Sequence, residues 1–333
     1  LIIKLDPMKY RSLITNLLIV GVMFSACRRD SNDEVSIVSH GLPKNGNANN
    51  NALSSLPFDV LAPADNPSVE ASMELGKALF WDPILSGDMD IACATCHHPS
   101  HGYADGRSTP LGVGGQGLGR NRRGGVVINR NAPTIINSAY NGIEPNGDYS
   151  PRTAPMFWDS RDRGLESQAI DPIHSLEEMR GNNFSDDDII PEILERLHAN
   201  DWYRVQFSVA FGPNAITELN IARALASFER TLVANDSPFD QFMRGDQTAL
   251  NAQQLRGMAT FQEVGCDECH KGPMFSDFAR RTMGVPEGDN LTTDSGAGNF
   301  DFRTPTLRNL ATTGPYMHNG SFSSLQEVLQ FYD

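Results

Sequence analysis

The chain has 333 residues, of which 39% are hydrophobic and 20% are charged, a composition typical of a globular protein. Its formal net charge of −14 at pH 7 argues against a nucleic-acid partner, because the phosphates would repel it. The acidity would suit a basic protein partner, or it only keeps the protein in solution. The length allows about two domains, each with a buried core.

The first segment has the pattern of an export signal, if Met8 is the start of translation. Lys9 and Arg11 supply positive charge, and residues 13–24 are mostly apolar. This apolar stretch is short for a membrane span and is followed by small residues, as in signal peptides. We therefore predict a signal peptide over residues 8–27 and a location in the periplasm or cell envelope.

Cys27 follows a pair of small residues, as in the lipobox of bacterial lipoproteins. It would otherwise be an unpaired thiol in an oxidising compartment, so we expect a lipid anchor there and no other attachment to the membrane. The alternative is an ordinary cleaved signal with a stray cysteine. Residues 28–55 are rich in Asn, Ser and Gly, which predicts a flexible linker.

The most specific signal is a pair of CxxCH motifs, CATCH at residues 93–97 and CDECH at residues 266–270. Two thiols three positions apart on a helical turn can bond to the two vinyl groups of one haem, and the next imidazole reaches the iron. The motifs predict two covalent haem c groups, held by Cys93, Cys96, His97, Cys266, Cys269 and His270.

The cysteine pairs could instead form two redox disulfides or a zinc site. Neither alternative accounts for a histidine directly after both pairs, and the motifs are too far apart for a compact zinc module. A G-x-A-x-F pattern at residues 76–80 and again at 257–261 precedes each motif. This repeat indicates two related haem-binding units, the first with an insertion.

Helical patterns dominate the rest of the chain, and no run of alternating strands is present. Residues 102–125 form a loop rich in Gly and Arg. We predict a mainly α fold of two cytochrome c-like haem domains with long loops, over residues 56–235 and 236–333. Helices are expected after Ser185 and Thr217 and before Gly265, with apolar faces at Ile221, Leu225, Phe228 and Leu232, and at Leu255, Met258 and Phe261.

From about residue 70 to its end the chain resembles the bacterial di-haem cytochrome c peroxidases and the related MauG-type enzymes. The resemblance lies in the order and spacing of RNAPT at 130–134, FWD at 157–159, FRTPTLRN at 302–309 and GPYMHNG at 314–320. It implies that the His97 haem is the peroxidatic one and that the His270 haem handles electron transfer.

The same resemblance implies a distal pocket with Glu178 as acid/base residue and with Gln168 and Pro172 as lining residues. A single positioned carboxyl group can take a proton from one peroxide oxygen and return it to the other. The alternative for Glu178 is a solvated acid beside Glu177. Trp158 matches the tryptophan that conducts electrons or holes between the haems, and its alternative is a core tryptophan.

Three further residues match positions that bind a calcium ion: Asn131, Thr313 and Pro315. They would offer one side-chain amide oxygen and two backbone carbonyls, with water completing the shell. Oxygen-only ligation suits Ca²⁺, but the lack of a carboxylate predicts a modest affinity.

The chain departs from the peroxidase pattern at two positions. The distal histidine of many relatives falls near Arg123, and there is no histidine between His101 and His174. We therefore expect a permanently open sixth site on the first haem. At the second haem the usual distal methionine is replaced by Tyr332, as in MauG-type enzymes, although a methionine elsewhere remains an alternative (Met283 or Met317). The chain stops inside what resembles a continuing helix, so we expect a fragment.

The leading functional expectation is a peroxidase that reduces hydrogen peroxide to water with electrons from a small donor such as cytochrome c. One alternative is MauG-like oxidation of a partner protein. Another is a non-enzymatic di-haem electron carrier, which requires two six-coordinate haems and makes Glu178 and Gln168 incidental.

Overall fold

A computed structural model describes residues 53–287 and 292–333 of the chain. These residues belong to one compact unit. The predicted signal peptide, the anchor at Cys27 and nearly all of the predicted linker lie outside the described residues. The boundary between residues 235 and 236 stays a prediction. No helix within the described ranges is both long enough and apolar enough to cross a membrane.

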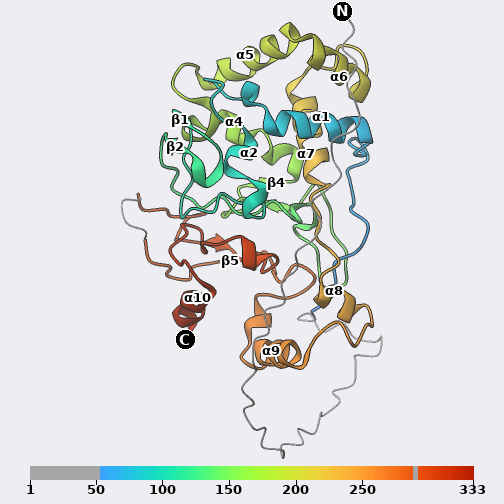
Figure 1. Ribbon diagram of the computed structural model, residues 1–333, viewed down its shortest axis with the longest axis vertical. Helices are drawn as coiled ribbons and strands as arrows, with labels where there is room; N and C mark the ends of the chain where they lie inside the picture. The colour runs from blue at the N-terminus through green and yellow to red at the C-terminus, as the bar shows by residue number, and fades with distance from the viewer. Residues whose placement is uncertain (1–52, 288–291) are drawn as a thin grey trace, which may run out of the picture. The chain divides into compact units, whose positions relative to one another are not determined.

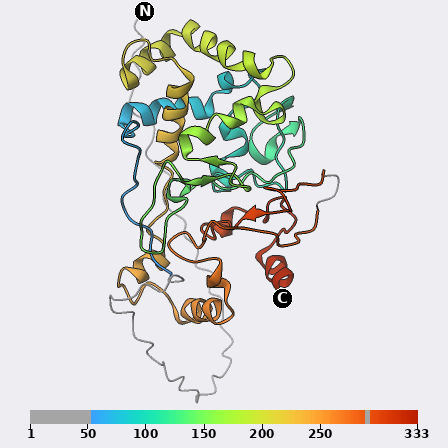
Figure 2. The same ribbon diagram turned by 180° about the vertical axis from the view of Figure 1, so that it is seen from behind.

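Four helices build the main hydrophobic core: α1 (Glu70–Trp81), α5 (Asp186–Ala199), α6 (Asp201–Phe211) and α7 (Glu218–Glu229). Helix α1 crosses α7 and packs against it, as both views of the ribbon show (Figure 1, Figure 2). Helix α1 also contacts α6, and α5 contacts α6. Of the face predicted for α7, Ile221, Leu225 and Phe228 are buried as their spacing predicts. Leu232 instead lies beyond the end of α7 and is partly exposed. The largest core residues include Leu75, Leu79, Phe80, Ile193, Leu197, Phe207, Ile221 and Leu225.

Helix α7 begins at the predicted cap, because the Thr217 side chain accepts a hydrogen bond from the Asn220 N–H. Gly76 explains how closely α1 approaches it. A Cβ built on Gly76 would lie 1.8 Å from the Ala224 carbonyl oxygen, so only glycine fits. Gly257, its counterpart in the repeat, has no neighbour within 4 Å of such a Cβ. The second copy of the sequence repeat therefore does not make the close helix contact that Gly76 makes with Ala224.

Three short helical segments follow in the middle of the chain: α3 (Leu165–Gln168), α4 (Asp171–His174) and a π-helical turn (Leu176–Arg180). Ile173 and Met179 are buried in the same core as α1 and α7. These buried anchors fix the short segments that carry Gln168, Pro172 and Glu178.

The later part of the chain carries α8 (Pro238–Met243), α9 (Ala252–Glu263) and α10 (Leu325–Tyr332), the red helix that ends the chain in Figures 1 and 2. Helix α9 has no buried residue, but its least exposed positions are the predicted ones: Leu255, Met258 and Phe261. Gly265 follows the helix with φ of 81°, the left-handed conformation expected of a glycine after a helix.

Strands in the described ranges are only two residues long and form three antiparallel pairs. The predicted mainly helical class is confirmed. The pairs are β1 (Gly115–Gln116) with β2 (Arg123–Gly124), β3 (Pro155–Met156) with β4 (Asp162–Arg163), and β5 (Arg280–Arg281) with β6 (Phe302–Arg303).

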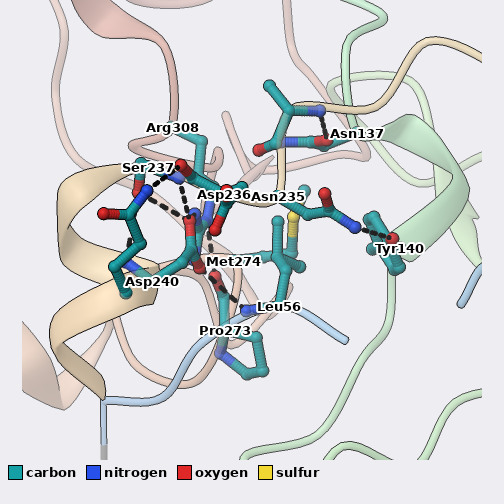
Figure 3. A network of polar contacts seen from close by, with 12 residues as sticks. Leu56, Asn137, Tyr140, Asn235, Asp236, Ser237, Asp240, Pro273, Met274 and Arg308 are labelled. Atoms are coloured by element: carbon teal, nitrogen blue, oxygen red, sulfur yellow. Dashed lines mark hydrogen bonds and ion pairs between the residues drawn. The ribbon is translucent and has the colours of Figure 1, made fainter. Parts of the chain in front are cut away.

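A buried ion pair ties distant parts of the chain together (Figure 3). Asp240 of α8 accepts hydrogen bonds from both terminal nitrogens of Arg308, at 2.7 and 2.9 Å. The same carboxylate accepts the Leu56 N–H at 3.0 Å and the Ser237 hydroxyl at 2.6 Å. With Arg308 also donating to the Pro273 carbonyl at 2.7 Å, this network fixes the chain just after the second CxxCH motif.

Candidate active site

The first CxxCH motif forms a one-turn helix, α2 (Cys93–Cys96), that opens onto a cavity of about 190 Å³. The Thr95 hydroxyl accepts the Ala92 N–H at 2.9 Å and starts the turn. The three-residue spacing puts both thiols on one face, and both line the cavity together with His97. Two thiols and an imidazole thus surround one space.

His97 has its ring held in one orientation. Its Nδ1 lies 3.1 Å from the Tyr103 carbonyl oxygen, and that nitrogen is assigned as the N–H donor because its partner can only accept. Burial lowers the pKa of His97, which favours the neutral imidazole. Nε2 is then left as a lone-pair donor, the form in which histidine binds a metal.

The second motif repeats this arrangement at a larger cavity of about 670 Å³, lined by Cys266, Cys269 and His270. The His270 Nδ1 lies 2.9 Å from the Phe275 carbonyl oxygen, and burial lowers the pKa of this imidazole too. In both motifs the backbone N–H of the histidine donates a hydrogen bond to the backbone carbonyl of the first cysteine at 3.0 Å. Both sites fit a covalently attached haem with histidine as axial ligand. Together they define a two-haem c-type protein.

The predicted distal residues lie together at the first cavity. Gln168 ends α3, Pro172 is in α4 and Glu178 is in the π-helical turn, and all three line the space that His97 also lines. Burial raises the pKa of Glu178, opposed by the positive charge of Arg161. A raised pKa makes the protonated form of a carboxyl group more accessible, as a group that both takes and gives a proton requires.

His97 is the only histidine among the described residues that line this cavity. Arg123, near which the distal histidine of relatives was expected to fall, lies in β2 and is exposed. It donates from Nη1 to the Arg120 carbonyl at 2.8 Å. Its neighbour Arg122 is instead fully buried and donates to the Gly112 carbonyl at 2.6 Å. The loop is therefore organised around Arg122, a role that was not predicted from the sequence.

Glu229 is a second carboxyl group at the first cavity, also missed from sequence. It ends α7, is 7% exposed, and its Oε2 has no hydrogen-bond partner among the described residues. Burial raises its pKa to about 8. The available signal was its position four residues after Leu225, which puts it on the buried face of the helix.

Tyr332 lines the second cavity, as the prediction of an axial ligand requires. Its side chain is about half exposed, and burial raises the pKa of its hydroxyl. Met283 and Met317 line the same cavity. The fold thus brings all three candidate ligands to the His270 side of the molecule without selecting one of them.

Trp158 lines both of these cavities and a third, smaller one of about 140 Å³. Its indole N–H donates to the Asn131 carbonyl at 2.9 Å, which fixes the ring.

The smaller cavity is also lined by all three predicted calcium ligands: Asn131, Thr313 and Pro315. The described ranges contain no group of three or more His, Cys, Asp or Glu residues able to hold a metal ion.

Comparison with known proteins extends this class assignment. Residues 70–248 match the family described as "Di-haem cytochrome c peroxidase". The methylamine utilization protein MauG of Methylophilus methylotrophus is 35% identical, over 83% of this chain and 76% of that protein. Cytochrome c551 peroxidase of Nitrosomonas europaea is also 35% identical, over 77% of this chain and 71% of that one. The chain belongs to the di-haem cytochrome c peroxidase and MauG family, as expected from its sequence motifs.

Solved structures agree with this assignment at the level of the fold. A MauG-like protein associated with microbial copper homeostasis has a TM-score of 0.68 at 27% identity, covering 83% of this chain and 81% of that one. The diheme peroxidase BthA of Burkholderia thailandensis E264 has a TM-score of 0.64 at 22% identity, covering 84% and 80%. The second likeness bears on the fold alone.

Proposed function

We propose that the protein is an oxidoreductase that reduces hydrogen peroxide to water, with electrons from a small donor protein such as cytochrome c. The observation that carries this proposal is the meeting of Glu178, Gln168 and Pro172 with His97 at one cavity. A protein that only carries electrons needs no such carboxyl group beside the metal. Family membership and relatives named as cytochrome c peroxidases support the same reaction.

When bound, the two haem c groups supply the electron exchange, with peroxide at the His97 side and with the donor at the His270 side. The side chains manage position and protons. Glu178 would take the proton from one peroxide oxygen and return it to the other, which leaves as water. Two electrons from the donor and two protons from solvent would convert the remaining oxygen to a second water. Gln168 offers an amide N–H to the bound peroxide, and Pro172 limits the space beside it.

Trp158 is proposed as the route between the two haems. Its ring lines both cavities and is fixed by the hydrogen bond to Asn131, so it has one defined position between them. The first haem is proposed to keep an open sixth position, since His97 is the only histidine among the described residues at its cavity. Tyr332 is proposed as the distal ligand of the second.

A second candidate function is MauG-like oxidation of a partner protein's side chains. Tyr332 at the second cavity and the similarity to MauG favour it. The two functions differ in the molecule that is oxidised. A peroxidase oxidises reduced cytochrome c in proportion to peroxide, whereas a MauG-like enzyme leaves covalent changes on another protein.

Two finer assignments belong to the same proposal. Asn131, Thr313 and Pro315 all line the smaller cavity. Ca²⁺ would bind there through the Asn131 amide oxygen and the carbonyl oxygens of Thr313 and Pro315. The protein would be located in the periplasm or cell envelope, held by a lipid on Cys27. That cysteine lies outside the described residues, so the anchor is supported by the sequence pattern alone.

The proposed function is tested on protein made in a host able to mature c-type cytochromes. Intact mass should show two added haem groups, and reduced cytochrome c should be oxidised when hydrogen peroxide is added. Two haems with no peroxide-dependent oxidation by any small donor would contradict the peroxidase assignment. Covalent change on a co-purified protein would favour the MauG-like alternative.

A further inference from the structure

Arg303 of β6 lines the His97 cavity, the His270 cavity and the third, smaller cavity. Its backbone N–H donates to the Trp158 carbonyl at 2.6 Å, and its Nε donates to the Phe157 carbonyl at 3.0 Å. These two bonds fix the guanidinium beside the proposed electron route. The two terminal nitrogens have no hydrogen-bond partner among the described residues.

No carboxylate within the described ranges lies within ion-pair distance of this guanidinium, which sets Arg303 apart from its neighbours. Arg130 pairs with Asp159 at 2.7 Å and Arg281 pairs with Asp277 at 2.6 Å. Burial, helped by the nearby charge of Arg163, lowers the pKa of Arg303 to about 10. Arg303 is partly buried, and a partly buried cation without a counter-charge is unfavourable. We therefore expect an anionic partner that is not one of the described side chains.

We propose that Arg303 is a shared counter-ion for the propionate carboxylates of both bound haems. The inference rests on the two haems of the proposed function. The planar fork of arginine can bind two carboxylates at once, which suits a residue that reaches both cavities. Haem propionates are the anions that a loaded chain would bring to these two cavities.

A positive charge at this point acts on both irons. It disfavours the ferric state, which carries one more positive charge than the ferrous state, and so raises both midpoint potentials. Because the same guanidinium serves both haems, its loss affects both. Arg303 is thus a positioning residue that sets the electrostatic environment on either side of Trp158.

The test is a redox titration of the holoprotein with each haem followed separately by its absorption spectrum. Arg303→Gln should lower both midpoint potentials. Arg163→Gln is the matched control, because it removes the same charge from an exposed position of β4 nearby. That control should change both potentials much less than Arg303→Gln does, since solvent weakens the effect of an exposed charge.

A shift at neither haem or at only one, in Arg303→Gln protein, would overturn the proposal. A shift of equal size in Arg163→Gln would do the same. If the glutamine variant does not fold, the same redox titration of Arg303→Lys protein tests the proposal. The ammonium group is a single point charge that can serve one carboxylate well, so at least one potential should fall, and two unchanged potentials overturn the proposal.

Haem content separates this proposal from the proposed function. A pyridine haemochrome assay that finds fewer than two haems in the wild-type chain removes the proposed function itself. Two haems together with an unaltered pair of potentials in Arg303→Gln protein removes only the role of Arg303.

Discussion

Asp240 and Arg308 form an ion pair that is almost completely buried, with side chains 0% and 5% exposed. Burial opposes ionisation of Asp240, yet the hydrogen bonds from Arg308 and Ser237 keep its pKa below the ordinary value. The pair therefore stabilises the fold above the ordinary carboxyl pKa, and this contribution is lost as the pH falls through the lower folded value.

Asp240→Asn should lower the free energy of unfolding by about 3–5 kcal/mol, because it leaves the Arg308 guanidinium buried without a counter-charge. Denaturant unfolding of the holoprotein at pH 7 measures this. Asp236→Asn is the control, since Asp236 pairs with Arg244 at the surface and should contribute less than about 1 kcal/mol. Equal effects of the two substitutions would contradict the structural role of the buried pair.

Glu178→Gln should reduce peroxide turnover by about 10²–10⁴-fold, the usual contribution of a general acid/base group. The amide keeps the shape of the side chain but cannot exchange the proton. Steady-state oxidation of reduced cytochrome c measures the loss, and haem content should not change. Glu177→Gln, at the exposed neighbouring position, should retain wild-type turnover. Full activity of Glu178→Gln protein would remove that carboxyl group from the mechanism.

Trp158→Phe should slow electron exchange between the haems while leaving peroxide binding intact. The smaller ring also loses the hydrogen bond to the Asn131 carbonyl, so its position is less well defined. Rapid-mixing spectroscopy that follows each haem after peroxide addition provides the measurement. Trp202→Phe, at a half-exposed position of α6, should behave as the wild type. Unaltered exchange in Trp158→Phe protein would exclude the proposed route.

Glu229 should make stability depend on pH between its ordinary pKa of 4.5 and its folded value of about 8. Over this interval the unfolded chain has released the proton and the folded chain retains it. Stability is therefore greatest below the ordinary value and falls as the pH rises, by up to about 1.4 kcal/mol per unit.

Glu229→Gln should remove this dependence, with little effect at pH 4.5 and a stabilisation at pH 8. Thermal unfolding of holoprotein at the two pH values measures it, with Glu177→Gln as the exposed control. A melting temperature difference between wild type and Glu229→Gln that does not change with pH would show that this carboxyl group is already ionised in the fold.

The haem attachment sites could be predicted from sequence because the bonding chemistry itself demands the CxxCH spacing. Gln168, Pro172 and Glu178 could be predicted from the family resemblance, and the chain brings them together because short helical segments with buried anchors connect them. The spacing of these three residues is local in sequence, but their meeting with His97 at one cavity depends on how distant segments pack.

Glu229 and Arg303 could not be predicted in the same way. Glu229 belongs to a segment whose pattern shows only a helix, and Arg303 to one that shows only a family motif. Each is assigned a role because it lines a cavity that distant residues form. The G-x-A-x-F repeat shows the converse difficulty. Gly76 is required by contact with Ala224, whereas Gly257 meets nothing, so equal sequence here does not mean equal packing.

The most direct test of two haems with one open iron is an EPR spectrum of the ferric holoprotein, taken before and after one equivalent of peroxide. We expect a high-spin signal from the His97 haem beside a low-spin signal from the His270 haem, with the high-spin signal lost when peroxide is added. Two low-spin signals that peroxide leaves unchanged would contradict the open site and leave an electron carrier in its place.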